Sequence, residues 1–218
     1  MISVLQNRRG AAIGVFLAAI ALLLAANAVA GTRTGHVHTQ RKVVILEGSE
    51  AFHFEDLPSM VATSTAVVRG SVVASSRGKV IDEQEVAYTR KLLDIQVQET
   101  LAGQPTDSHA QVEMAGWRQI DGEAETELRL ADGLPVGVGD QGIFFLYDFE
   151  HDGRYGMVNT QGVYLADGAE VRDSNRTDPL VRKLEALTMA DLNQLIEQAK
   201  DAVKAGDVKP QRYPGSGS

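Results

Sequence analysis

The chain has 218 residues, with 21 Lys+Arg against 29 Asp+Glu, and it contains no cysteine. The missing thiols exclude structural disulfides, thiolate metal ligands and a lipid-modified cysteine anchor, so an apolar core has to hold the protein together. The length suits one domain with an N-terminal appendage better than two independent cores.

The first 30 residues have the pattern of an export signal. Arg8 and Arg9 are their only charged residues, and an apolar segment follows that ends in Ala28-Val29-Ala30. A basic start, an apolar centre and a small-x-small end predict a signal peptide cleaved before Gly31. The segment is also about the ~20 residues long that span a bilayer, so an uncleaved transmembrane anchor is the alternative. The arginine pair also allows twin-arginine export, for which the small residues after Arg9 are atypical.

Charge limits the partners of the exported part. Without residues 1–30, which hold two arginines and no acidic residue, the chain carries 19 Lys+Arg and 29 Asp+Glu, a net charge of −10. Such a surface repels nucleic acids and anionic lipids. We therefore expect no nucleic-acid partner, and contact with the membrane only through the N-terminal segment.

Residues 31–41 are small and polar and read as a linker. His36 and His38 have a spacing that suits a metal ion, but no third ligand lies nearby, which favours a solvated linker. We expect a single domain over residues 42–206 and a disordered tail over residues 207–218.

The first half of the domain predicts strands and one short helix. Residues 42–46 predict a strand, Asp56 can cap a helix that begins at Leu57, and residues 66–74 predict a strand with a bulge or bend at Gly70. That strand is expected to end at residues 75–78. A long strand over residues 86–100 changes its apolar face near Leu92-Leu93, which predicts a second bulge. Weaker strands are expected at residues 111–115 and 127–130.

The densest apolar run of the domain, Ile143 to Leu146, predicts a central strand that is buried on both faces. The residues before it, 137–142, spell G-x-G-x-x-G, but a dinucleotide site needs a helix after the third glycine. A strand follows here, so a glycine-rich turn is the better interpretation. Strands near residues 154–159 and 162–166 follow, with a hairpin signal at Asp167-Gly168.

The C-terminal part has helical periodicity. Asp178-Pro179 can start a short helix, and residues 188–191 resemble a capping box for a second one that ends at Gly206. The second helix carries one apolar stripe, formed by Leu192, Leu195, Ile196, Ala199 and Val203. We expect this stripe to dock on the strands. The predicted fold class is mainly β (α+β): a small antiparallel OB-like β-barrel with a C-terminal helical segment packed on it.

Several of these segments, taken in their order along the chain, resemble those of a known group of proteins. They are residues 66–73, Leu93-Asp94-Ile95-Gln96-Val97 with Leu101-Ala102-Gly103, residues 138–146 with Gly153-Arg154-Tyr155, Gln161-Gly162-Val163-Tyr164, and Asp178-Pro179-Leu180. Over roughly residues 57–205 the chain resembles uncharacterised secreted or membrane-anchored actinobacterial proteins. More remotely it is similar to the OB-type barrel of netrin-like and metalloproteinase-inhibitor domains. The absence of the N-terminal cysteine of such inhibitors means that only the barrel is implied.

Residues that could carry chemistry are few. Asp148, Glu150 and Asp152, ahead of Gly153, resemble the start of a calcium loop, but Asn159 stands where a bidentate Glu is needed, so a hairpin turn is the alternative. No serine lies on a Gly-x-Ser-x-Gly elbow, and His53-Phe54-Glu55 lacks the cysteines of a zinc deaminase. Trp117, the only tryptophan, is expected in a loop, as a contact residue or as a core or rim aromatic.

The sequence thus predicts no catalytic, cofactor or metal site. The main hypothesis is an extracytoplasmic, non-catalytic binding or structural module whose protein or ligand partner is unknown. The alternative is a hydrolase or metal-dependent enzyme assembled from dispersed residues such as His53, His109, His151 and Asp148.

Overall fold

The computed structural model describes residues 42–46, 50–83, 86–104, 107–174 and 176–212. The predicted export signal and linker, residues 1–41, lie outside these ranges. Within the described part of the chain, no helix is long and apolar enough to cross a membrane.

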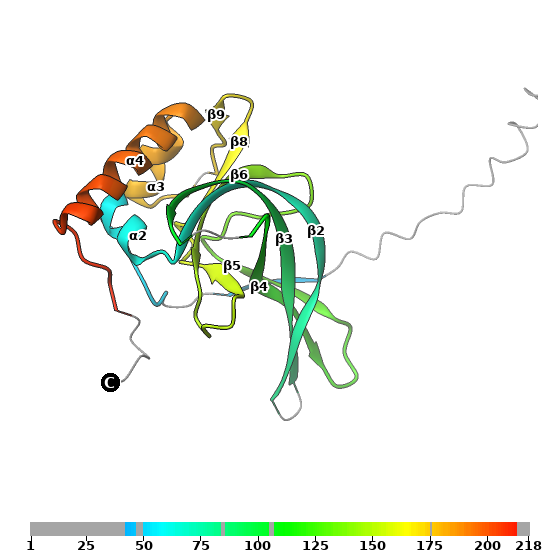
Figure 1. Ribbon diagram of the computed structural model, residues 1–218. Helices are drawn as coiled ribbons and strands as arrows, with labels where there is room; N and C mark the ends of the chain where they lie inside the picture. Colours follow the sequence, from blue (N-terminus) through cyan, green and yellow to red (C-terminus); the bar gives the residue numbers. More distant parts are fainter. Residues whose placement is uncertain (1–41, 47–49, 84–85, 105–106, 175, 213–218) are drawn as a thin grey trace, which may run out of the picture. The chain divides into compact units, whose positions relative to one another are not determined.

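The described residues form a mainly β fold with helices near the C-terminus, as the sequence predicted (Figure 1). In chain order the elements are β1 (Val43–Leu46), α2 (Leu57–Thr63), β2 (Ala66–Glu83), β3 (Val86–Gly103), β4 (His109–Ile120), β5 (Thr126–Leu130), β6 (Gln141–Tyr147), β7 (Tyr155–Met157), β8 (Val163–Asp167), β9 (Glu170–Val171), α3 (Pro179–Glu185) and α4 (Met189–Ala205).

The strands form one extended sheet in the order β1-β5-β4-β3-β2-β6-β8-β9. The short strand β7 pairs with both β4 and β6, so β2, β3, β4, β7 and β6 make a closed ring of hydrogen-bonded neighbours. Most pairs are antiparallel, as expected, but β1–β5 and β4–β7 are parallel. The ring leaves β1 and β5 outside it, at one edge of the sheet.

Strand β6 is buried on both faces, which confirms the prediction for the apolar run. Phe144 and Leu146 belong to a cluster inside the ring, with Val68, Leu93, Ile95 and Val112. Ile143 and Phe145 belong to a second cluster, which β6 shares with the helices. The turn before β6 also matches its interpretation, because residues 137–142 lead into a strand and not into a helix.

The long strands differ from their predicted ends. β2 does not stop at residues 75–78 but continues to Glu83, paired with β3 along its whole length. Gly70 lies at a register shift, as predicted, and a Cβ there would stand 2.5 Å from the Gln96 carbonyl oxygen. The second irregularity lies at Arg90 and not at Leu92-Leu93. The extra residues belong to the neighbouring strands, since two residues of β2 and two of β4 stand opposite Arg90, and the sequence of β3 alone does not show this.

The helices begin where their caps predict. The side chains of Asp56, Asp178 and Thr188 accept hydrogen bonds from the backbone of the first turns of α2, α3 and α4, and Gly206 ends α4 in a left-handed conformation. The three helices gather on one side of the ring (Figure 1), where they cover the outer face of β6.

Only part of the predicted stripe on α4 is fully buried. Leu192, Ile196 and Ala199 are, whereas Leu195 and Val203 are half-buried. Leu195 instead lines a groove between α2, α3 and α4. The chain after α4 is also held in part, since the backbone and side-chain nitrogens of Gln211 donate to Thr63 Oγ1 and to the His53 carbonyl oxygen.

A buried ion pair fixes the start of the C-terminal part. Arg176 Nη2 lies 2.7 Å from Glu185 Oε1, and both side chains are almost inaccessible. The same guanidinium donates to the carbonyl oxygens of Thr160 and Val163 and lies over the ring of Tyr164. These bonds compensate the cost of burying the charges, and they tie α3 to the strand β8.

The different burial along α4 predicts different costs of truncation. Replacing Ile196 by Ala should lower the free energy of unfolding by about 2–5 kcal/mol. Leu195→Ala should cost clearly less, because its side chain is already in partial contact with water, and Gln198→Ala should cost less than about 0.5 kcal/mol. Urea melts of the three variants measure this order. Equal midpoints for Ile196→Ala and Gln198→Ala would contradict the docking of α4.

Tyr164 predicts a loss of stability at high pH. Its hydroxyl is buried and makes no hydrogen bond within the described residues. Burial raises the pKa of Tyr164 above its ordinary value, although Arg176 opposes the shift. Above about pH 10 the unfolded chain therefore releases a proton that the folded chain keeps, and the free energy of unfolding falls as the pH rises.

Tyr164→Phe should remove this part of the pH dependence. At neutral pH it should leave the protein as stable as before, or more stable by about 1–3 kcal/mol, because it removes an unsatisfied buried hydroxyl. Denaturant melts at pH 7 and between about pH 10 and 11 test both points, with Tyr88→Phe on β3 as the matched control. A marked loss of stability in Tyr164→Phe at pH 7 would show that the hydroxyl has a partner.

Candidate functional site

Three strands extend beyond the ring. β2 pairs with β6 only as far as Ser71, and β7 pairs with β4 only at Val112 and Glu113. Past these points β2, β3 and β4 continue together, and Figure 1 shows them projecting away from the helices. We call residues 76–83, 86–92 and 114–120 the arm.

One side of the arm continues the inner side of the ring. Side chains on directly paired residues point to the same face, and alternate residues along a strand do so too. The pairs Arg77↔Lys91, Lys91↔Met114, Val80↔Thr89, Thr89↔Trp117 and Trp117↔Glu127 therefore share one side. Lys91 is two residues from Leu93, which is fully buried inside the ring. We call this set the arm face: Arg77, Val80, Thr89, Lys91, Met114, Trp117 and Glu127.

Trp117 is therefore not in a loop, as the sequence predicted, but in strand β4. It is half-buried and belongs to neither of the two apolar clusters. Gly116 next to it explains why the strand was missed, because a glycine usually weakens a strand. Here a bulge needs it: a Cβ at Gly116 would stand 2.3 Å from the Thr89 carbonyl oxygen and 2.6 Å from the Lys91 nitrogen.

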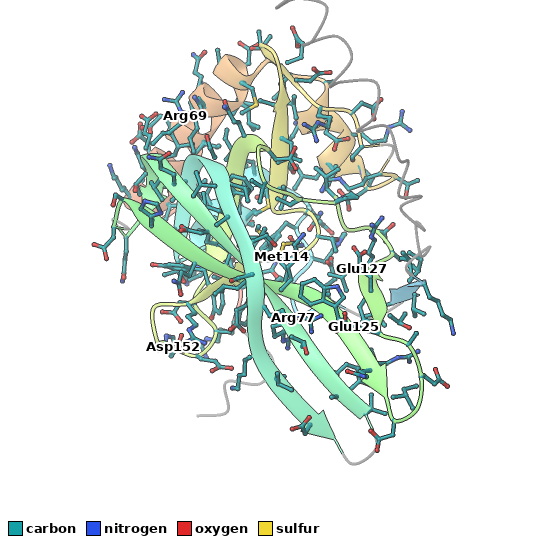
Figure 2. The ribbon with its side chains drawn as sticks, turned by 90° about the vertical axis from the view of Figure 1, so that its right-hand side faces the viewer. Arg69, Arg77, Met114, Glu125, Glu127 and Asp152 are labelled. Carbon is teal, nitrogen blue, oxygen red and sulfur yellow. The ribbon has the colours of Figure 1, made fainter. Side chains whose placement is uncertain are left out.

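Arg77 covers the indole of Trp117. Its guanidinium carbon lies 4.9 Å from the ring centroid, and its Nη2 lies 2.7 Å from Glu125 Oε2. Figure 2 shows Arg77 and Glu125 side by side, at a distance from Arg69 and Asp152. A cation over an exposed aromatic ring contributes about 0.5–1 kcal/mol, and an exposed ion pair no more than about 1 kcal/mol. Because the arrangement is weak and half-exposed, a partner can rearrange it at little cost.

Lys91 marks the junction between the arm face and the ring. Its Nζ donates to the Val136 carbonyl oxygen at 2.8 Å. Burial lowers the pKa of Lys91. The negative charges of Glu127 and Asp140 oppose this shift, and the positive charge of Arg129 adds to it. Val136 itself is part of the inner cluster. The lysine thus ties the segment before β6 to the end of the ring from which the arm projects.

The charges on and beside the arm face nearly cancel. Arg77 pairs with Glu125 and Arg129 with Glu127, and Lys91 lies near Glu127 and Asp140, the second of which also pairs with Arg172. On a domain whose net charge is strongly negative, this is a surface that an acidic or neutral protein can approach without strong repulsion.

The calcium-loop residues do not converge. Asp148 Oδ2 accepts from the Gly153 backbone, Asp152 Oδ1 accepts from the Arg154 backbone, and Glu150 faces Lys79. These are the bonds of a turn that joins the antiparallel strands β6 and β7, which was the alternative interpretation. Asn159 lies in the core, bonded to the Phe52 carbonyl oxygen. Among the described residues, no group of three or more His, Asp or Glu side chains could hold a metal ion.

The dispersed histidines have different neighbours. His53 lies 3.9 Å from Asp178, at the start of α3, and His109 lies 2.7 Å from Asp94, at the start of β4. His151 is exposed in the turn between β6 and β7, with a positive φ of 55°. The structure therefore brings two histidines next to carboxylates, but next to two different ones.

The bulge in the arm predicts that a larger residue at position 116 destabilises the fold. Gly116→Ala should lower the free energy of unfolding by about 1–3 kcal/mol, because the methyl group collides with the backbone of β3. The fluorescence of Trp117, the only tryptophan, should shift as its surroundings change. Gly137→Ala is the matched control, since a Cβ there meets nothing closer than 4.0 Å. Identical melts and spectra for the two variants would refute the close approach.

Neither the protein-family models nor the curated proteins contain a match to this chain. The arm face is therefore the main indication of a function: it is a half-exposed aromatic and charged surface on three strands that project from a filled ring.

Proposed function

We propose that the chain is an exported, non-catalytic binding module that holds a protein partner on the arm face. Export is supported by the pattern of residues 1–30, with two arginines ahead of an apolar segment. In this proposal the domain acts outside the cytoplasmic membrane, either secreted or anchored there by its N-terminal segment. It touches the membrane only through that segment.

The proposal includes an OB-like β-barrel as the scaffold. Its support is the closed ring of β2, β3, β4, β7 and β6, together with an interior filled by apolar side chains. The remote similarity to netrin-like domains and the resemblance to secreted actinobacterial proteins point the same way. In OB folds, ligands are bound by the face of the second and third strands and by the loop that joins the first and second. Here those strands are β3 and β4, and the β2–β3 hairpin forms the tip of the arm.

The observation that carries the proposal is the position of Trp117. Tryptophan is enriched at binding hot spots, and it contributes most where neighbouring groups exclude water around it. Trp117 lies outside both apolar clusters, half-buried, with Arg77 over its ring and Met114 on the same face. The arm adds little to the core, so its extension beyond the ring is better explained by contact with a partner than by folding.

The aromatic, apolar and paired charged side chains of the arm face restrict which kind of molecule can bind there. An extended protein segment fits, because its side chains can meet Trp117 and Met114 while its polar groups exchange with the exposed Arg77–Glu125 pair. Nucleic acids and anionic membranes do not fit, because Arg77 and Arg129 are already paired with carboxylates and the chain is acidic as a whole.

Truncating side chains of the arm face should weaken binding and leave the fold intact. Trp117→Ala and Arg77→Ala should each weaken capture of the partner by about tenfold or more. The measurement is quantitative pull-down from intact cells that express the tagged full chain, with melts of each variant to confirm folding.

Arg69→Ala provides the matched control. Arg69 and Glu99 form an exposed pair at 2.8 Å that is equivalent to Arg77–Glu125 but lies on the ring (Figure 2). Arg69→Ala should capture the same proteins as the wild type. If all variants retain the same proteins, or if the wild type captures nothing above background, the arm face is not the binding surface.

A further inference from the structure

Strand β2 carries an unpaired edge along the arm. One side of β2 pairs with β3 throughout, whereas its other side pairs with β6 only up to Ser71, and with the segment before β6 at Val72. From Ala74 to Asp82 that second side has no backbone partner among the described residues. An exposed edge of this length is a template for another strand.

The edge is partly apolar. Val80 is 54% exposed, and it stands near the middle of the outer part of β2, between Lys79 and Ile81. Edge strands are normally protected by charges and irregularities, and this one has Lys79 and a register shift between Arg77 and Val80. A strand that pairs with this edge would bury the exposed side chain of Val80, which favours the pairing.

We propose that this edge pairs, antiparallel, with the same edge of a second copy of the chain, with Val80 at the two-fold axis. Two-fold dimers use the same patch on both copies, and an antiparallel strand pair has that symmetry. With the axis at Val80, the two Val80 side chains face each other. Gly78 and Lys79 together occupy one position in the bulge, so both lie opposite Ile81, and Asp82 lies opposite Arg77. Arg77, Val80 and Asp82 share one face, so Asp82 of each copy lies next to the basic side chain of Arg77 of the other.

The charge of this edge favours a second copy. Arg77 and Lys79 are exposed, and their present partners, Glu125 and Glu150, are surface pairs that are worth little in water. In the dimer Arg77 of each copy lies opposite Asp82 of the other, so the edge is complementary to itself. The two-fold arrangement also closes the interface, since each edge is used up by one partner and no fibre can grow.

The dimer should be weak. A single pair of strands of this length buries less than the ~1,200 Å² of a standard stable interface. We therefore expect a dissociation constant in about the micromolar to millimolar range, and an association that anchoring or secretion at high concentration would promote. The contact uses the backbone edge of β2 together with Val80 and Arg77, which also belong to the arm face, but it does not involve Trp117. Trp117→Ala therefore distinguishes it from binding of the partner proposed for the arm face.

A cysteine at position 80 tests the geometry directly, because the chain has no other thiol. Residues directly opposite in an antiparallel pair have Cβ atoms about 4.5–5.5 Å apart, close enough for a disulfide after a small adjustment. The full chain carrying Val80→Cys, purified in detergent and mildly oxidised, should form covalent dimers at least about tenfold faster than Val43→Cys. Val43 is an exposed valine on the edge strand β1 and reports random collisions. Equal rates for the two variants would overturn the proposal.

Placing a charge at the axis gives a second readout that needs no covalent bond. In sedimentation experiments, Val80→Lys and Val80→Asp should each weaken self-association about tenfold or more, because like charges then face each other. An equimolar mixture of the two should restore it, and Val43→Lys should behave as the wild type. A wild type that stays monomeric up to about millimolar concentration, or a mixture that associates no better than either variant alone, would refute the dimer. Trp117→Ala should still dimerise, which separates this result from the test of the arm face.

Discussion

Burial of β6 on both faces is the constraint on which the rest of the structure depends. Phe144 and Leu146 on one face and Ile143 and Phe145 on the other are fully buried. Each such side chain contributes about 1.5–3 kcal/mol when it is removed from water, and neither face can be left open. The ring of strands covers one face and the helices cover the other. In a chain without cysteine, no covalent link shares this task.

The ring and the helices bury the two faces of β6 in different ways. Inside the ring, Val68, Leu93, Ile95 and Val112 pack against β6 and fill the space with side chains. On the outer side, α4 lies against α2, and the Arg176–Glu185 pair holds α3 to the adjoining strand β8. Both regions are committed to stability. A contact surface for another protein therefore has to lie on structure that the core does not need, and the arm is such a structure.

The arm combines a face and an edge with different chemistry. The face carries an aromatic ring under a guanidinium, with its charges nearly balanced. The edge carries backbone groups, one exposed valine and a basic segment followed by an acid. Side-chain recognition and strand pairing are different ways of binding, and one three-stranded projection carries both, with Val80 and Arg77 taking part in each.

The sequence by itself determined the elements whose signals are local. The caps at Asp56, Asp178 and Thr188 place the helix starts, and the run Ile143 to Leu146 identifies the central strand, because capping bonds and burial on both faces leave a pattern within a few residues. The bend at Gly70 could be read in the same way. The turn at residues 148–153 could be recognised as an alternative to a calcium loop.

Only the tertiary structure decided the extent of β2, the position of Trp117 and the closure of the ring. Residues 75–83 are mostly polar and contain a glycine, and they form a strand because β3 supplies backbone partners along their length. Trp117 looked like a loop residue because Gly116 is a strand breaker in isolation, whereas the close approach of β3 requires that glycine. The same limit applies to the candidate site. Arg77 is 48 residues from Glu125 in the sequence, and strand register, which depends on pairing between distant segments, brings it to Trp117 and Glu125.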